Sequence, residues 1–321
     1  MTEPMKELCV AHLIRGQNGI KTFIRFIESY RQNPGGIDHD LLVIFKGFNS
    51  PDEKKEYLRL LAPFKYATLD VPDIGFDITA YFTVVKRFAA QYRYFCFLNS
   101  SSEILDHEWL SKLHKHISQP EVGLAGATGS CESRRSQTFT LQDIFDVARH
   151  HYRLHKNKSF WKRTILGGLG AWHHCQSVGA WDYFLTVDVW DYFLSQVCFD
   201  PFPNCHLRTN AFIISSQTMS DLKCPLIQNK MDAYRFESGK NGLTTQILRK
   251  GKRVIVVGRN GLSYDKGAWD ASNTYRISEQ ENLLVADNQT RDYQCSIPER
   301  REFLSSITWE NKSHLSREDA G

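Results

Sequence analysis

The chain has 321 residues, of which 41% are hydrophobic and 24% charged, and its formal net charge is +4. These values are typical of a globular protein and argue against a disordered, collagen-like or coiled-coil chain. The charge is too small for this length to indicate nucleic-acid binding, so we expect no nucleic-acid partner.

The first ten residues, MTEPMKELCV, contain two acidic residues and no apolar core. They do not resemble a signal peptide, and no stretch of the sequence reaches the roughly 18 to 20 apolar residues of a membrane span. None of the eight cysteines forms a C-x-x-C pair, so a zinc knuckle is not indicated. We therefore expect a cytoplasmic protein with reduced cysteines, with a disulfide-stapled secreted domain as the alternative.

Strand and helix patterns alternate through the first hundred residues. Apolar runs such as LLVIF at 41–45 are typical of strands covered on both faces, and apolar residues at i, i+3, i+4 and i+7 indicate the helices. The expected strands are 8–14, 41–45, 66–71 and 94–98, and the expected helices between them are 23–30, 51–62 and 78–89. This order predicts an α/β fold with a Rossmann-like, mainly parallel sheet flanked by helices.

Ligands of such sheets bind at the carboxyl ends of the strands, which selects the loops 15–19, 46–50 and 99–103. The first loop, RGQNG, does not have the G-x-G-x-x-G spacing of a dinucleotide site, and an ordinary strand-to-helix turn is its alternative.

The pattern changes between residues 136 and 203, where we expect a helical and aromatic insert. Residues 149–163 concentrate positive charge, and Trp-Asp-Tyr-Phe-Leu occurs twice, at 181–185 and 190–194. The basic segment suits an anionic acceptor or an anionic membrane surface, and a solvated helix face is the alternative. The aromatic segments are core or an acceptor lid.

The alternating pattern then resumes with a strand at 211–215, a helix at 243–248 and a strand at 253–257. The last fifty residues are polar and are expected to be mostly irregular. We therefore predict a domain at 1–270 that includes the insert, and a C-terminal extension, 271–321, packed on it.

Three segments within 8–130 and 205–260 resemble the GT-A glycosyltransferases, in particular the bacterial family-2-like enzymes that build surface polysaccharides. Residues 73–81, DIGFDITAY, resemble the segment before the helix that precedes the metal-binding strand, and FLNSS at 97–101 occupies the place of the D-x-D motif. FESG at 236–239, with Leu243, Gln246 and Gly251, resembles the late E-D-x-x-L-x-x-R signature with a small insertion.

The late carboxylate is the catalytic base of inverting members, so the resemblance implies this role for Glu237, with Asp232 in reserve. A helix N-terminal acid is the alternative for Glu237. The D-x-D carboxylates are replaced by Asn99 and Ser101, which are poor ligands for Mg²⁺ or Mn²⁺. We expect no tightly bound metal, with Glu103 and His206 as weak candidate ligands.

Without a metal ion, positively charged side chains must neutralise the charge of the donor's diphosphate. The residues expected to bind the nucleotide sugar lie at or near the strand ends: His12, Arg15, Lys46, Asp73, Asp77, Asn99, Ser101, Arg208, Asn210, Arg235 and Lys240. Helix capping is the alternative for Asp73 and Asp77, and a turn that starts a helix is the alternative for Asn99 and Ser101.

The resemblance thus implies an inverting glycosyltransferase whose donor is a sugar linked to a nucleoside diphosphate. We expect this donor to be a UDP-sugar. Its acceptor would be a hydroxyl of a bacterial surface glycan, such as O-antigen or capsule, free or lipid-linked, and it would work in the cytoplasm with peripheral contact at the inner membrane. The alternatives are a sugar-nucleotide-binding or scaffold module without catalysis, suggested by the missing D-x-D, and a nucleotidyltransferase.

Overall fold

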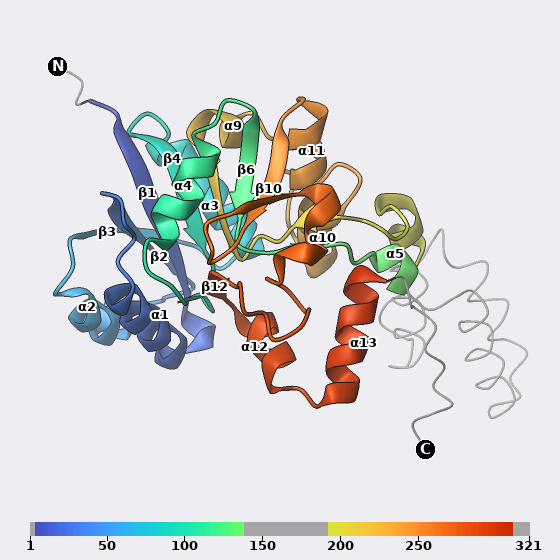
Figure 1. Ribbon diagram of the computed structural model, residues 1–321. Coiled ribbons are helices and arrows are strands. Elements are labelled where there is room, and N and C mark those ends of the chain that lie inside the picture. The colour runs from blue at the N-terminus through green and yellow to red at the C-terminus, as the bar shows by residue number, and fades with distance from the viewer. Residues whose placement is uncertain (1–3, 138–191, 311–321) are drawn as a thin grey trace, which may run out of the picture.

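A computed structural model describes residues 4–137 and 192–310. Figure 1 shows a central sheet with helices on both faces, and this confirms the predicted α/β fold with a mainly parallel sheet. The strand order is β11-β10-β6-β9-β4-β1-β2-β3. Neighbouring strands are parallel except at β9 and β11, which run antiparallel to their partners.

The strands of this sheet are β1 (Lys6–Arg15), β2 (Asp40–Lys46), β3 (Tyr66–Val71), β4 (Tyr92–Leu98), β6 (Val122–Gly126), β9 (Ala211–Ser215), β10 (Arg253–Val257) and β11 (Ser263–Asp265). The helices are α1 (Ile20–Gln32), α2 (Lys55–Leu61), α3 (Phe76–Phe88), α4 (Trp109–Ile117), α5 (Arg134–Gln137), α9 (Ser216–Ser220), α10 (Lys230–Ser238), α11 (Leu243–Arg249), α12 (Asn288–Cys295) and α13 (Pro298–Trp309). Every strand and helix predicted in the first hundred residues is present within a few residues of its expected bounds.

The two faces of the sheet carry separate apolar clusters, because successive side chains of a strand point to opposite faces. Leu8 and Val10 of β1 pack in one cluster with residues of α1, α2 and α4, whereas Cys9 and Ala11 pack in the other with residues of α3, α10 and α11. Burial on both faces explains why the central strands are continuous apolar runs.

Two segments differ from the sequence expectation. Strand β6, VGLAG, was not predicted, since its small residues lack the β-branched pattern, but the sheet accepts them because a Cβ on Gly126 would meet Leu207 at 2.6 Å. After β4 the chain forms the short strand β5 (Glu103–Ile104) before α4 begins at Trp109, so the turn at Asn99 and Ser101 does not start a helix, as its alternative interpretation had it.

The C-terminal segment is more ordered than its polar composition indicated. It contains α12 and α13, and β12 (Val285–Ala286) pairs with β5. Tyr275 is fully buried. Figure 1 shows this segment lying against the end of the sheet at which β12 is labelled.

The expectation of uniformly reduced cysteines is corrected by a disulfide. Cys131 and Cys205 are bonded and flank the paired short strands β7 (Gly129–Ser130) and β8 (His206–Leu207). Cys9 and Cys96 are free and buried, where a cysteine packs as a small apolar residue.

Most of the predicted insert at 136–203, including the basic segment 149–163 and the aromatic copy at 181–185, lies outside the described residues. Among the residues described, no helix combines the length and the apolar character needed to cross a bilayer.

Candidate functional site

Several of the predicted site residues lie at one edge of the sheet, where its parallel strands end. Strand β1 ends at Arg15, β2 ends at Lys46 and β4 ends at Leu98, while the antiparallel β9 begins opposite Leu98 at Ala211. The loops after these strands, the turn between β8 and β9, and helix α10 therefore share one edge, which is where ligands of open α/β sheets bind.

Arg15 and Asp73 form a bidentate ion pair at this edge. Nε and Nη2 of Arg15 donate to the two carboxylate oxygens of Asp73 at 3.0 and 3.2 Å, and Gln17 donates to the same carboxylate at 3.0 Å. The side chains of Arg15 and Asp73 are 29% and 23% exposed. Both groups can therefore exchange their partners for those of a ligand without leaving a deeply buried charge alone.

Lys46 is buried and anchors the loop that carries Asp73. Its ammonium donates to the carbonyl oxygens of Ile74 and Phe76, the latter at 2.7 Å, and lies 3.9 Å from Asp73. Burial lowers the pKa of Lys46, and the charges of Asp73 and Asp77 oppose that shift. Lys46 was predicted to bind the nucleotide, but in the structure its ammonium holds the backbone of this loop through hydrogen bonds.

Asp77 lies in the first turn of α3 and makes no hydrogen bond or ion pair within the described part of the chain. It does not cap the helix, since the N-cap residue is Gly75. Burial raises the pKa of Asp77 to about 6; Lys46 and Arg15 oppose the rise and Glu237 adds to it. A carboxyl in this setting costs folding free energy, which is typical of functional sites.

Asn99 forms the turn that follows β4. Its side-chain oxygen accepts hydrogen bonds from the Ser101 backbone amide at 2.9 Å and the Ser102 hydroxyl at 3.2 Å. The backbone amide of Asn99 donates to the backbone carbonyl of Asn210 at 3.0 Å. The turn of the alternative interpretation is therefore present, but it leads into β5 and not into a helix. Asn99 thus shapes the edge through its own backbone.

The residues at the D-x-D position do not fit a divalent metal. Glu103 receives a hydrogen bond from Arg291 at 3.0 Å and lies 3.7 Å from Arg25, and Nδ1 of His206 pairs with the carbonyl of Asn204 at 2.8 Å. Two guanidinium groups beside one carboxylate repel a cation. Within the described ranges no cluster of three or more His, Cys, Asp or Glu residues could hold a metal ion. The structure therefore does not support Glu103 and His206 as metal ligands.

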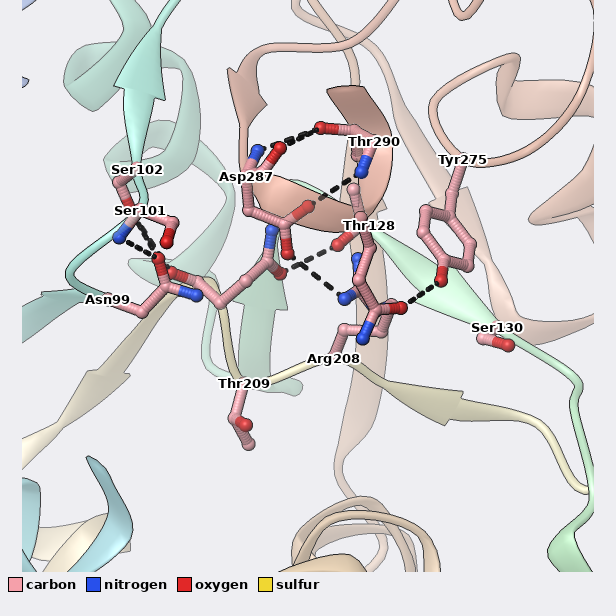
Figure 2. Close-up of polar contacts among 12 residues, drawn as sticks. Asn99, Ser101, Ser102, Thr128, Ser130, Arg208, Thr209, Tyr275, Asp287 and Thr290 are labelled. Carbon is pink, nitrogen blue, oxygen red and sulfur yellow. Dashed lines mark hydrogen bonds and ion pairs between the residues drawn. The ribbon is translucent and has the colours of Figure 1, made fainter. Parts of the chain in front are cut away.

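Arg208 is held by the C-terminal segment, as Figure 2 shows. Its Nη2 donates to Asp287 at 3.0 Å and its guanidinium stacks 4.2 Å from the ring centre of Tyr275, while Thr290 donates to Asp287 at 2.9 Å. Burial alone would lower the pKa of Arg208, but Asp287 and Tyr275 raise it above its ordinary value. Burial would raise the pKa of Asp287, yet Arg208 and Thr290 hold it below its usual range.

Two buried donors beside this ion pair have no partner in the described part of the chain. One is Nη1 of Arg208, which is 8% exposed, and the other is Nδ2 of Asn210, which is 4% exposed. The side-chain oxygen of Asn210 accepts a hydrogen bond from the hydroxyl of Thr128 at 2.7 Å, which orients the amide group. Buried donors of this kind require an acceptor, supplied by water or by a ligand.

Glu237 lies in the last turn of α10, so the helix N-terminal alternative is wrong. The backbone amide and the hydroxyl of Thr209 donate to Oε1 of Glu237 at 2.7 and 2.9 Å. No hydrogen bond reaches Oε2 from any residue that the structure describes. One carboxylate oxygen is therefore fixed and the other is available to a substrate hydroxyl.

The reserve candidate Asp232 has a structural role. It forms a capping box with Asn229. The backbone amide of Asn229 donates to the Asp232 carboxylate at 3.2 Å, and the Asn229 side-chain oxygen accepts from the Asp232 backbone amide at 3.0 Å. Arg235 lies 3.5 Å from Asp232 and is 44% exposed, and Lys240 has no hydrogen bond from its ammonium to any described residue. The structure therefore gives Asp232 a helix-capping role in place of the predicted catalytic one.

His12 is fully buried and does not line the site. Its ring stacks on Phe26 at 3.5 Å, neither ring nitrogen has a partner within the described ranges, and burial lowers its pKa to about 3. It is a neutral core residue on the α1 face of the sheet, and its prediction as a nucleotide contact is wrong.

Four residues of this edge were not predicted: Thr209, Tyr275, Asp287 and Arg291. The last three lie in the segment expected to be irregular. The spacing of Asp287 and Thr290 after an apolar run is an N-cap signature that could have revealed α12. No local pattern could have revealed which arginine Asp287 binds.

No family model matches the sequence, and neither does any curated protein. Solved structures that resemble the chain include the mannosyltransferase PcManGT from Pyrobaculum calidifontis in complex with GDP-Man and Mn²⁺, with 10% identity and a TM-score of 0.31 over 42% of this chain and 40% of that one. Core-mannan synthase A from Aspergillus fumigatus, in its Mn/GDP form, has 9% identity and a TM-score of 0.34 over 77% and 65%. TarS from S. aureus has 13% identity and a TM-score of 0.30 over 37% and 34%. The chain spans less than two thirds of each neighbour's length.

Proposed function

We propose that the protein is an inverting glycosyltransferase that moves a sugar from a nucleotide diphosphate to an acceptor hydroxyl. The observation that carries the proposal is the carboxylate of Glu237, which has one oxygen fixed by Thr209 and the other without a partner in the described chain. It lies at the carboxyl edge of the sheet, close enough to Asp77 and Arg208 to affect the pKa of both. The resemblance of residues 236–251 to the late glycosyltransferase signature supports the same role.

In this reaction Glu237 accepts the proton of the acceptor hydroxyl as that oxygen attacks the anomeric carbon. The bond between the anomeric carbon and the phosphate oxygen breaks, and its electron pair leaves with the nucleoside diphosphate. Attack from the face opposite the leaving group inverts the configuration of the anomeric carbon. One carboxylate suffices, since no covalent sugar–protein intermediate forms.

The charge that develops on the leaving diphosphate requires positively charged donors. Arg208 offers a buried guanidinium nitrogen without a partner in the described chain, Asn210 offers an amide nitrogen from the same turn, and Arg15 offers a partly exposed guanidinium. Arginine recognises phosphate oxygens through directed hydrogen bonds. We infer that these residues bind the diphosphate, because the D-x-D position lacks a set of metal ligands.

The donor and the acceptor follow from the family resemblance. We propose a UDP-sugar as donor and a hydroxyl of a bacterial surface glycan, such as O-antigen or capsule, as acceptor, either free or lipid-linked. The reaction would take place in the cytoplasm at the inner face of the membrane, and the 136–203 insert would help to form the acceptor site.

A thermal-shift screen tests the donor and the metal together. Ligands that bind the native state raise the melting temperature, so we expect a UDP-sugar to raise it more than GDP-, CMP- or dTDP-sugars and to do so equally in EDTA and in Mn²⁺. No shift with any sugar nucleotide would contradict the proposal. A shift only with Mn²⁺ would contradict metal-free binding.

The variant Glu237→Gln then tests catalysis. Loss of a general base should lower the rate of sugar transfer by roughly 10²–10⁴-fold while the thermal shift by the donor persists. Asp232→Asn is the matched control on the same helix and should retain the rate. A wild type that binds donors but transfers no sugar would instead favour the non-catalytic module, and consumption of a nucleoside triphosphate with a sugar phosphate would favour the nucleotidyltransferase.

A further inference from the structure

The turn between β8 and β9 presents two donors to a single oxygen of Glu237. The amide of Thr209 lies 2.7 Å and its hydroxyl 2.9 Å from Oε1. Two hydrogen bonds to one carboxylate oxygen fix the rotation of the carboxylate plane and leave the second oxygen directed elsewhere.

This carboxylate occupies an electrostatically unfavourable place. It lies in the C-terminal turn of α10, where the helix macrodipole opposes negative charge. Asp77, on the neighbouring helix α3, adds a second acidic group, and Glu237 in turn raises the pKa of Asp77. A glutamate that served only to join α10 to the turn would be better placed away from both.

The turn itself does not depend on the hydroxyl of Thr209. Other hydrogen bonds hold it on both sides, from the Arg208 amide to Thr128 at 3.1 Å and from the Leu207 amide to the Thr244 hydroxyl at 2.8 Å. After the turn, the carbonyl of Asn210 accepts from the Asn99 amide at 3.0 Å. The hydroxyl can thus be removed with the backbone still in place.

We propose that Thr209 is the positioning residue of the catalytic base: its two donors fix Oε1 of Glu237, so that Oε2 faces the acceptor hydroxyl. The inference rests on the proposed function. Loss of the hydroxyl leaves one donor on Oε1, so the carboxylate should turn more freely and present Oε2 to the acceptor for less of the time.

The test compares Thr209→Val, which keeps the shape and the amide but lacks the hydroxyl, with Thr209→Ser, which keeps both donors. The measurement is the rate of sugar transfer at saturating donor, with Glu237→Gln as the reference for loss of the base. We expect Thr209→Ser to keep the wild-type kcat within about 2-fold, whereas Thr209→Val should lose most of it. Equal kcat values in Thr209→Ser and Thr209→Val overturn the inference. Equal melting temperatures would show that all variants fold.

The same assay, with UDP-glucose and GDP-mannose as donors, separates kcat from KM. In Thr209→Val we expect kcat to fall roughly 10-fold and KM for the donor to stay within about 2-fold. A wild-type kcat in Thr209→Val, with or without a change in KM, would make the contact merely structural and overturn the inference. A wild type that transfers from neither donor, and binds no sugar nucleotide in the thermal screen, would remove the proposed function and this role with it.

Discussion

Two arginine–aspartate pairs flank the candidate site, and they differ in burial. The side chains of Arg15 and Asp73 are 29% and 23% exposed, whereas those of Arg208 and Asp287 are 9% and 1% exposed. An exposed pair gains little free energy and exchanges readily with water or ligand. A buried pair gains little net free energy as a pair, but removal of one partner leaves the other charge desolvated and alone.

The partners of the two arginines also come from different parts of the chain. Asp73 belongs to the loop between β3 and α3, close in the fold to Arg15, whereas Asp287 caps α12 in the C-terminal segment. The segment thus supplies a buried anion to the site in addition to covering the sheet. The exposed pair, Arg15 and Asp73, can exchange its contacts for those of a ligand. The buried pair, Arg208 and Asp287, holds the Arg208 guanidinium in a constant position.

The largest expected effect concerns the buried pair. Asp287→Ala leaves Arg208 without a counter-charge and should lower the free energy of unfolding by about 3–5 kcal/mol, measured by urea denaturation at pH 7.5. The matched variant Asp73→Ala should lower it by only about 0–1 kcal/mol.

The pH dependence of this effect has a definite sign. Since Arg208 and Thr290 hold the pKa of Asp287 below its usual range, the contribution of the carboxylate is complete above about pH 4 and is lost as the pH falls through the lowered folded value. Equal losses in Asp287→Ala and Asp73→Ala would show that the two pairs do not differ in the way their burial indicates.

An intermediate effect is expected from Asp77, the acid on the exposed side without a hydrogen bond to any described residue. Its pKa is raised to about 6, so the folded state holds the proton more tightly than the unfolded chain. Stability should therefore fall as the pH rises from about 4 to 6. Asp77→Asn removes this loss and should stabilise the protein at pH 7.5 by about 1–3 kcal/mol.

The measurement is urea unfolding of wild type and Asp77→Asn at pH 5 and pH 7.5, with a larger difference expected at the higher pH. A difference of the same size at both values would mean that Asp77 does not carry this charge penalty. If the substitution also weakens nucleotide-sugar binding, the penalty is retained for function, as at other strained sites.

The smallest effect on stability is expected from Arg15. Arg15→Ala should change the free energy of unfolding by less than about 1 kcal/mol, because the guanidinium is partly solvated. It should nevertheless weaken UDP binding by roughly 10-fold in isothermal titration calorimetry, since a charge-assisted hydrogen bond to phosphate is lost. Arg93→Ala, on an exposed arginine near the start of β4, is the control and should leave the affinity unchanged.

The sequence was sufficient for the features that depend on local periodicity. The apolar runs predicted β1 to β4, and the spacing of Phe23 to Tyr30 predicted α1, because a strand or helix buries the same face at each repeat. The order of these elements predicted a mainly parallel sheet and hence the edge at which the polar loops meet. Glu237 was selected from the sequence through its resemblance to a known signature.

The tertiary structure decided what each of these side chains contacts. His12 and Asp232 have the chemistry of site residues, but one is enclosed against Phe26 and the other caps α10. The local sequence around Thr209 and Asp287 does not show which residue each of them contacts, yet they hold Glu237 and Arg208 across 28 and 79 residues of sequence. Contacts at such separations depend on how the whole chain closes, so periodicity and spacing, which are local, cannot reveal them.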